Sequence, residues 1–386
     1  MDRPGAVPLL IVGASARAAA QSALRAGFQP LCVDAYADRD LRETCPVCPW
    51  PPCTRELVEL VASLPTRSWI YTGGLENRPG LVGRLSRRLP LWGNADSVLR
   101  RARDPSTLHR LLGEADLPVL PVRRADQPPP GDGRWLIKPC RGSGGRAIMV
   151  WRGTTSALPK EPYYFQQLAE GVDISALYLA QGEQVQWIGS TRQWSGQTGG
   201  VTSPHAWHGN VVGEPLPDQV TTQMQRVGQV LVAGLGLRGL FGCDFRLAGS
   251  TPWLLEINPR YTGSVELFEW ALRRPLLREH AVACGFPEAE LSPIPREPDP
   301  PGSINRLYAR RIVYATRGGE AHFPDVLPCW AGGFTPSPLA DIPVGGQLLR
   351  PGDPICSIFA SGSNSAELDH QIHDWMFRIS SWIRPT

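Results

Sequence analysis

The chain has 386 residues, 42% of them hydrophobic, so it is long enough for two or three domains with buried cores. Its 39 basic and 36 acidic residues give a net charge of +3, and the basic residues are scattered. This argues against nucleic-acid binding, which needs a basic stripe or patch, and no apolar run reaches the roughly 18 to 20 residues that span a membrane. We therefore expect a cytoplasmic protein that acts on small molecules. The oligomeric state stays open, with a homodimer as one alternative.

Residues 1–100 predict a small Rossmann-like α/β domain. A short apolar strand, PLLIVGAS, leads into an alanine-rich helix that ends at Gly27, and a second strand ends at Asp34. This explains the opening better than a secretion signal does, because the apolar run covers only 7–12 and Arg17 interrupts the alanine-rich stretch after it.

Ligands of such sheets collect at the carboxyl ends of the strands, which here lie near Gly13–Arg17, Asp34 and Gly73–Asn77. Asp34 follows the first glycine at about the interval of a dinucleotide-binding fingerprint. However, GASARA lacks the second and third glycines, so NAD or FAD binding is the disfavoured alternative.

Three of the nine cysteines, Cys45, Cys48 and Cys53, lie in the segment CPVCPWPPC, which has CxxC spacing. A structural zinc site needs four ligands, usually from two such pairs, and no second pair is present. A proline-rich surface loop is therefore favoured over a zinc site.

Residues 101–300 predict a mixed α+β region. In chain order we expect a helix from Asp104, a strand–glycine turn–strand unit in RWLIKPCRGSGGRAIMVW, further strands, and the helix PDQVTTQMQRVGQVLVAGLGL. The hairpin GLFGCDFRLAGSTPWLLEINPR follows. Residues 301–386 are predicted to be strand-rich and to close with a helix from Ser365.

The hairpin places hard oxygen ligands together. With its turn near Ser250, Asp244 lies almost opposite Glu256, and Asn258 shares their face because side chains alternate along a strand. Two carboxylates and an amide oxygen suit Mg²⁺, and Arg260 can reach a phosphoryl oxygen. The alternative is a polar strand end with ordinary ion pairs.

The strand–glycine turn–strand unit is a candidate phosphate site. Lys138, one of only two lysines in the chain, ends a strand, and Gly142, Gly144 and Gly145 follow. Glycines let backbone N–H groups converge on an anion, and the lysine adds a positive charge. A glycine-rich turn without a ligand is the alternative. Further on, Gln167 and Asp173 form a weaker signal for adenine and ribose recognition.

Taken in this order, these motifs resemble the ATP-grasp superfamily, in which two α+β subdomains hold ATP between them. The resemblance covers about residues 100–300. It implies a preceding Rossmann-like domain at 1–100, an ATP-grasp domain at 101–300 with a lid subdomain at about 120–178, and a strand-rich segment at 301–386 that completes the ATP-grasp region.

The resemblance also implies ATP and magnesium, or manganese in its place, as cofactors. It assigns nucleotide binding to Lys138, Gly142, Gly144, Gly145, Gln167 and Asp173, metal binding to Asp244, Glu256 and Asn258, and stabilisation of the transferring phosphoryl group to Arg260 and Arg192. The chain departs from the family where Asp104-Pro105 replaces an early lysine, so Arg101 or Arg103 takes over its contact, or the contact is absent. Gln167 stands where glutamate is common.

The implied activity is ATP-dependent amide formation between a small-molecule carboxylate and an amine through an acyl-phosphate, with release of ADP and phosphate. The run LADIPVGGQLLRPGDPICSIFASG resembles the tail of the pyrrolysine-type and tyramine–glutamate ligases, which favours an amino acid or a cofactor precursor as substrate. His205 and His208 are candidates for substrate contacts, or simply surface groups. A bicarbonate-using enzyme similar to biotin carboxylase and a non-catalytic ATP-binding sensor remain as alternatives.

Overall fold

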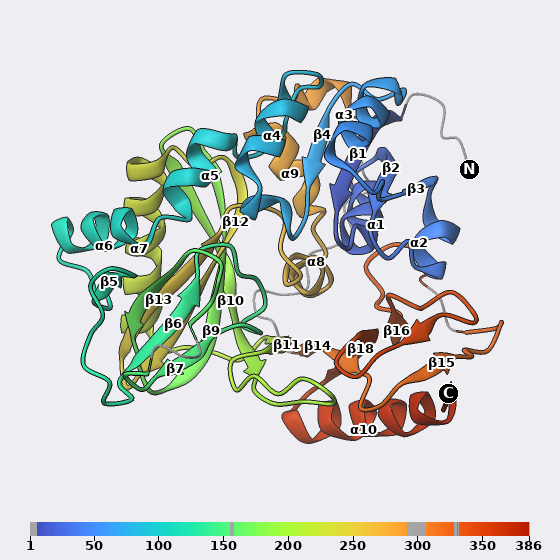
Figure 1. The fold of residues 1–386 in the computed structure, drawn as a ribbon. Helices are drawn as coiled ribbons and strands as arrows, with labels where there is room; N and C mark the ends of the chain where they lie inside the picture. The colour runs from blue at the N-terminus through green and yellow to red at the C-terminus, as the bar shows by residue number, and fades with distance from the viewer. Residues whose placement is uncertain are drawn as a thin grey trace.

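The computed structural model describes residues 6–154, 158–291, 293, 306–327, 330 and 332–385 (Figure 1). Its strands form an N-terminal parallel sheet, a small antiparallel sheet, a large eight-stranded sheet and a three-stranded C-terminal sheet. Within the described part of the chain, no helix is both long enough and apolar enough to cross a membrane.

The N-terminal unit is an α/β layer, as predicted. Its parallel strands have the order β3-β2-β1-β4. Alternate residues of the first strand pack into two different cores, so both faces of the sheet are covered, as parallel sheets require. The strands are β1 (Val7–Gly13), β2 (Phe28–Asp34), β3 (Val47–Pro49) and β4 (Trp69–Tyr71), and the helices are α1 (Arg17–Arg25), α2 (Arg39–Thr44), α3 (Thr54–Ser63), η1 (Leu75–Asn77), α4 (Pro79–Ser86) and α5 (Asp96–Ala102).

The small sheet follows helix α6 (Pro105–Glu114), which the Asp104 carboxylate caps by accepting the amides of the first turn. Its strand order is β5-β8-β6-β7, around a core of aromatic and aliphatic side chains. The strands are β5 (Val122–Arg124), β6 (Trp135–Pro139), β7 (Met149–Trp151) and β8 (Tyr163–Gln167). The expected lid range of 120–178 therefore runs past this sheet into the next strand, which belongs to the large sheet.

The large sheet is antiparallel throughout, with the order β13-β12-β9-β10-β11-β14-β18-β16. Helix α7 (Asp218–Leu235) buries its apolar stripe against one face. The C-terminal segment supplies β14, β18 and β16, so it completes the sheet that the predicted hairpin begins. The strands are β9 (Val172–Gln181), β10 (Gln184–Ser195), β11 (Trp207–Val212), β12 (Gly239–Ala248), β13 (Thr251–Asn258), β14 (Leu307–Tyr314), β16 (Leu339–Ala340) and β18 (Pro354–Gly362).

The remaining elements join these parts. Helix α8 (Val265–Leu272) lies near the centre of the molecule, between the N-terminal unit and the C-terminal strands (Figure 1). The closing helix predicted from Ser365 is confirmed as α10 (Ser365–Ser381). The others are α9 (Leu276–Ala283), η3 (Glu288–Glu290), β15 (Gly319–Ala321), β17 (Leu348–Leu349) and β19 (Ile383–Arg384).

Candidate active site

A cavity of about 250 Å³ is lined by residues of both the small and the large sheet. Every predicted site residue except Arg192 lines it. These residues are Lys138, Gly142, Gly144, Gly145, Gln167, Asp173, Asp244, Glu256, Asn258 and Arg260. Groups that lie up to 122 residues apart in the sequence therefore face one space.

The hairpin of β12 and β13 has the predicted register, since Asp244 pairs with Glu256. A β-bulge produces it. Ala248 pairs with Thr251 across the turn, and Phe245 with Leu254, but the next pair skips Leu255. This extra residue brings the two carboxylates opposite each other, and bulges are known to re-aim side chains beside active sites.

The Asp244 carboxylate is the centre of the acidic group. It accepts hydrogen bonds from the Asn258 side-chain nitrogen and the Gln193 side-chain nitrogen, both at 2.8 Å. Burial, and then repulsion from Glu256, raise the pKa of Asp244 to about 7. Two carboxylates that repel each other in this way, with an amide beside them, fit a divalent cation bound through oxygen. Sequence reasoning missed Gln193.

Lys138 reaches across the cavity from the small sheet. It is only 6% exposed, and its Nζ donates to Gln166 Oε1 at 2.9 Å and to the Leu255 carbonyl at 3.3 Å. The latter acceptor is the bulge residue, immediately before Glu256. Lys138 thus lines the same cavity as the acidic pair and contacts the residue next to Glu256.

The glycine-rich turn is held over the cavity by hydrogen bonds to its carbonyl oxygens. The Gly142 carbonyl accepts from Arg103 at 2.7 Å and from Asn77 at 3.2 Å. The Trp207 amide donates to the Gly144 carbonyl at 3.0 Å, and Ser203 to that of Gly145. No acceptor among the described residues is bonded to the amides of the three glycines, so these N–H groups are free to bind an anion.

Asp173 and Gln167, the other two residues expected to contact the nucleotide, differ in whether their side chains already have partners. Asp173 is ion-paired with Arg246 at 3.0 Å and also accepts from Ser195, so its carboxylate is already engaged. Gln167 lines the cavity, and its backbone N–H donates to the Pro121 carbonyl. Its neighbour Gln166, which sequence reasoning did not single out, is the one that holds the lysine.

Arg260 is fixed by a residue of the N-terminal unit. Its Nη2 donates to Glu76 Oε1 at 2.7 Å and to the Asn258 side-chain oxygen at 3.2 Å. Glu76 is 1% exposed, and the Arg260 guanidinium, outweighing burial, lowers the pKa of its carboxyl. The expected strand-end loop at Gly73–Asn77 therefore contributes to the site, through a carboxylate that the sequence argument did not use.

The placement of Arg192 corrects the prediction of a catalytic role. Its guanidinium pairs with Glu214 at 2.7 and 2.8 Å and does not line the cavity. Side chains alternate along β10, and Gln193 faces Asp244, so Arg192 points to the other side of the sheet.

Of the two arginines proposed to replace the early lysine, Arg103 lies at the cavity. It donates to Glu256 Oε2 at 3.3 Å as well as to the glycine-rich turn. Arg101 instead bonds the carbonyls at the end of α7, Gly234 and Leu235.

The remaining candidates divide in the same way. His205 lines the cavity, and burial lowers its pKa. His208 does not line it and is buried, which lowers its pKa to about 4. Among the described residues, no group of three His, Cys, Asp or Glu side chains could hold a metal, so the cysteine segment forms no such site there.

Asp34, the acidic residue that a bound dinucleotide would need, is already hydrogen-bonded to backbone groups of the chain. Its carboxylate accepts the backbone amides of Ala16, Tyr36 and Ala37. These bonds tie the start of α1 to the following turn and leave little capacity for a ribose.

Comparison with known proteins bears on the family and the fold. Residues 106–264 match the model of the ATP-grasp domain family. The large chain of carbamoyl phosphate synthase from Thermus thermophilus is 25% identical over 260 residues, which cover 62% of this chain but 24% of that protein, so the match spans about a quarter of the relative's length.

Two solved structures share the fold over nearly the whole chain. Biotin carboxylase from Campylobacter jejuni has a TM-score of 0.67 at 12% identity, covering 97% of this chain and 91% of its own. The L-amino acid ligase from Bacillus licheniformis has a TM-score of 0.66 at 13% identity, covering 98% of this chain and 99% of its own. At such identities the likeness shows the fold.

Proposed function

Because the chain carries an ATP-grasp domain at residues 106–264 within an ATP-grasp fold, we propose that it is an ADP-forming carboxylate-amine ligase. The observation that carries the proposal is the contact of Lys138 with the bulge beside Glu256. Lys138 and the acidic pair line one cavity, which supports the proposal because transfer of a γ-phosphoryl group needs phosphate and metal ligands side by side.

ATP would lie between the two sheets. Lys138 and the free amides of the glycine-rich turn would hold its phosphates, and Arg103 would supply the charge that the early lysine supplies elsewhere in the family. Gln167 and Asp173 would lie near the adenosine. Asp173 would have to exchange part of its contact with Arg246 for the ribose hydroxyls.

Asp244, Glu256 and Asn258 would hold magnesium or manganese, which when bound neutralises phosphate charge. The Asn258 side chain now donates to Asp244, so its oxygen would have to turn toward the cation. Burial, and then repulsion from Glu256, raise the pKa of Asp244, and a bound cation would offset both effects, so the donor set fits such an ion.

The reaction would begin with attack of a substrate carboxylate oxygen on the γ-phosphorus of ATP, breaking its bond to the bridging oxygen and giving an acyl-phosphate and ADP. An amine then attacks the acyl carbon, phosphate leaves, and the amine loses a proton. Arg260, fixed by Glu76, would stabilise the phosphoryl group in transfer. The substrate is an amino acid or a cofactor precursor.

A second function, carboxylation with bicarbonate, is favoured by the similarity to biotin carboxylase. It needs a biotin-bearing partner. The two functions differ in the acceptor of the activated carboxyl group, so a direct assay separates them.

The test is ADP release from MgATP in the presence of pooled amino acids and amines, and separately with bicarbonate and biotin. Release that needs both a carboxylic acid and an amine supports the ligase. Release that needs bicarbonate supports the carboxylase. Tight MgATP binding without release under either condition would support a sensor and refute the ligase.

A further inference from the structure

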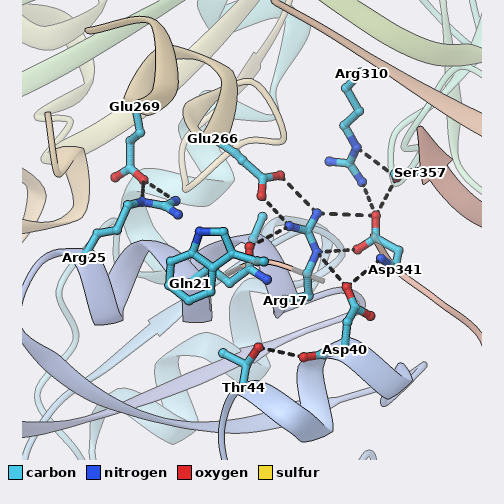
Figure 2. Close-up of polar contacts among 12 residues, drawn as sticks. Arg17, Gln21, Arg25, Asp40, Thr44, Glu266, Glu269, Arg310, Asp341 and Ser357 are labelled. Atoms are coloured by element: carbon cyan, nitrogen blue, oxygen red, sulfur yellow. Dashed lines mark hydrogen bonds and ion pairs between the residues drawn. The ribbon is translucent and has the colours of Figure 1, made fainter. Parts of the chain in front are cut away.

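Five charged side chains, four of them buried and Asp341 partly exposed, meet where the N-terminal unit, α8 and the C-terminal segment come together (Figure 2). We name them the Arg17 cluster: Arg17, Asp40, Glu266, Arg310 and Asp341. Arg17 is 1% exposed and Glu266 is fully buried.

Arg17 joins the three parts directly. It grips the Glu266 carboxylate with both terminal nitrogens, one of them at 3.0 Å, and its Nε donates to Asp341 Oδ1 at 2.9 Å. Asp40 lies 3.7 Å from the same nitrogen and accepts the backbone amides of Asp341 and Ile342. One arginine of α1 thus connects α2, α8 and the segment before β18.

The cluster continues to the wall of the cavity. Arg310, on β14, donates to Asp341 at 2.8 Å and to Ser357 at 3.1 Å. Its remaining terminal nitrogen lies 3.0 Å from the point where a Cβ of Gly263 would stand. Gly263 and Ser264 line the cavity, and Glu266 follows two residues later. The turn at Thr262–Ser264 therefore lies between two members of one network, Arg310 beside Gly263 and Glu266 two residues after Ser264.

A buried ion network of this kind is poor evidence for stability, because removing charges from water offsets most of their attraction. Its better-attested use is to select one arrangement of the parts that it joins. Here those parts include the turn that follows Arg260. This turn follows Asn258 and Arg260 in the chain, whereas Lys138 belongs to the small sheet and the glycine-rich turn follows it there.

We propose that Glu266, gripped by Arg17, is a positioning residue that fixes the turn at 262–264, which lines the active cavity, and keeps Arg310 packed against Gly263 of that turn. The kinetic consequence of this proposal rests on the proposed ligase function. Its structural consequence, the rigidity of the turn, does not.

Helix α8 offers a matched control. Glu269 is also fully buried and is paired with an α1 arginine, Arg25, and with Ser22. Within the described residues, its hydrogen bonds reach neither the turn nor Arg310. Glu266→Gln and Glu269→Gln therefore remove the same charge from the same helix, and only the first loosens the network at the cavity.

The first experiment is hydrogen exchange, read by mass spectrometry, on the peptide covering 259–268 in the full chain. We expect its amides to exchange at least tenfold faster in Glu266→Gln than in Glu269→Gln, while both variants lower the melting temperature. Similar exchange in the two variants, or no change in the first, would overturn the proposal.

The second experiment measures MgADP affinity and amine-dependent ADP release with the acceptors found in the assay above. In Glu266→Gln, MgADP affinity stays within twofold of wild type and release falls at least tenfold; Glu266→Asp, which keeps the charge, recovers part of the loss. A weakened MgADP affinity with unchanged release would refute the positioning role. Failure of the wild type to release ADP refutes the ligase instead, and leaves the exchange result to decide the positioning.

If Glu266→Gln does not fold, Arg310→Lys tests the same link from the other side. Lysine keeps the charge but cannot bridge Ser357 and Asp341 as the planar guanidinium does. The same faster exchange at 259–268 is expected, and an unchanged turn would count against the proposal.

Discussion

Lys138 and Lys160 are the two lysines of the chain, and they lie in opposite environments: the first is buried in the cavity wall and the second is exposed. We expect Lys138→Met to weaken ATP binding by about 1.5 to 3 kcal/mol, the usual worth of hydrogen bonds to charged groups, or about 10- to 150-fold. Calorimetric titration with an ATP analogue measures it. Lys160→Met is the control and should bind as wild type does; equal affinities in both variants would remove Lys138 from the nucleotide site.

Asp244 gives the site a pH dependence whose sign can be worked out. Its pKa is raised to about 7 in the metal-free protein, so below that pH the carboxyl is increasingly protonated. A cation binds the ionised form, and its affinity therefore falls as the pH drops through 7, approaching about tenfold per pH unit for one proton. Manganese titrations followed by paramagnetic resonance between pH 5.5 and 8.5 would show this, and Asp244→Asn should remove the dependence. A flat profile in the wild type would contradict it.

Arg192 and Gln193 show what residue-level sequence reasoning can and cannot decide. Both lie on β10. Thr191 of β10 pairs with Ser175 of β9, so these two side chains point to the same face of the sheet as Asp173, two residues before Ser175. Gln193, two residues beyond Thr191, therefore faces the cavity and Arg192 does not. The alternation was available in the sequence, but the register between β9 and β10 was not. Glu76 was out of reach for a similar reason, because its partner Arg260 is 184 residues away.

At the scale of elements, the glycine-rich turn is hydrogen-bonded to the segment around Ser203 and Trp207 at the start of β11. Gly144 and Gly145 both have left-handed backbones, with φ of +65° and +70°. A Cβ at Gly144 would meet nothing within 4 Å, whereas one at Gly145 would stand 1.8 Å from the His205 carbonyl oxygen. Only the second would force the turn away from the loop.

This difference predicts an order of effects. Gly144→Ala should cost about 1 to 2 kcal/mol of left-handed strain, or about 5- to 30-fold in ATP affinity if binding needs the closed turn. Gly145→Ala should cost more, since the clash adds to the same strain. Both variants are compared by ATP titration and by melting temperature, which we expect to change little because the turn lies outside the cores. A weaker effect at Gly145 than at Gly144 would show that closure is not required.

The hairpin was the most predictable element of the site, although one detail was hidden. Strand alternation and a turn near Ser250 predicted that Asp244 opposes Glu256, and the register confirms that pairing, although the observed turn alone would have set Asp244 opposite Leu255. The bulge at Leu255, which makes the pairing possible and frees the carbonyl that Lys138 contacts, has no signal in the sequence. A bulge depends on how a strand pairs with its neighbours, and pairing is a property of the folded sheet.

At the scale of the molecule, the order of motifs predicted the ATP-grasp fold and its N-terminal α/β domain, and both are confirmed. The way in which these parts meet was not predictable. Arg17 stood in the sequence as a break in an apolar run, and Asp341 as one acid in a distant segment, 324 residues away. Only the folded chain brings them together, because buried ion pairs between distant segments leave no periodic pattern to find.

The C-terminal segment is predicted to be indispensable, because the eight-stranded sheet runs through it. Residues 209–212 of β11 pair with β14, and Val211 is fully buried beneath that junction. A chain ending at residue 291 would expose this strand edge, and unpaired edges promote association between chains. We expect the shortened chain to aggregate in size-exclusion chromatography, and a separate chain of residues 306–386 to restore a monodisperse complex. A chain ending at Arg384, the last residue of β19, should behave as the full chain does. If residues 1–291 were monodisperse and bound ATP with the affinity of the full chain, strands β14, β18 and β16 would be an addition to the nucleotide-binding unit rather than part of it.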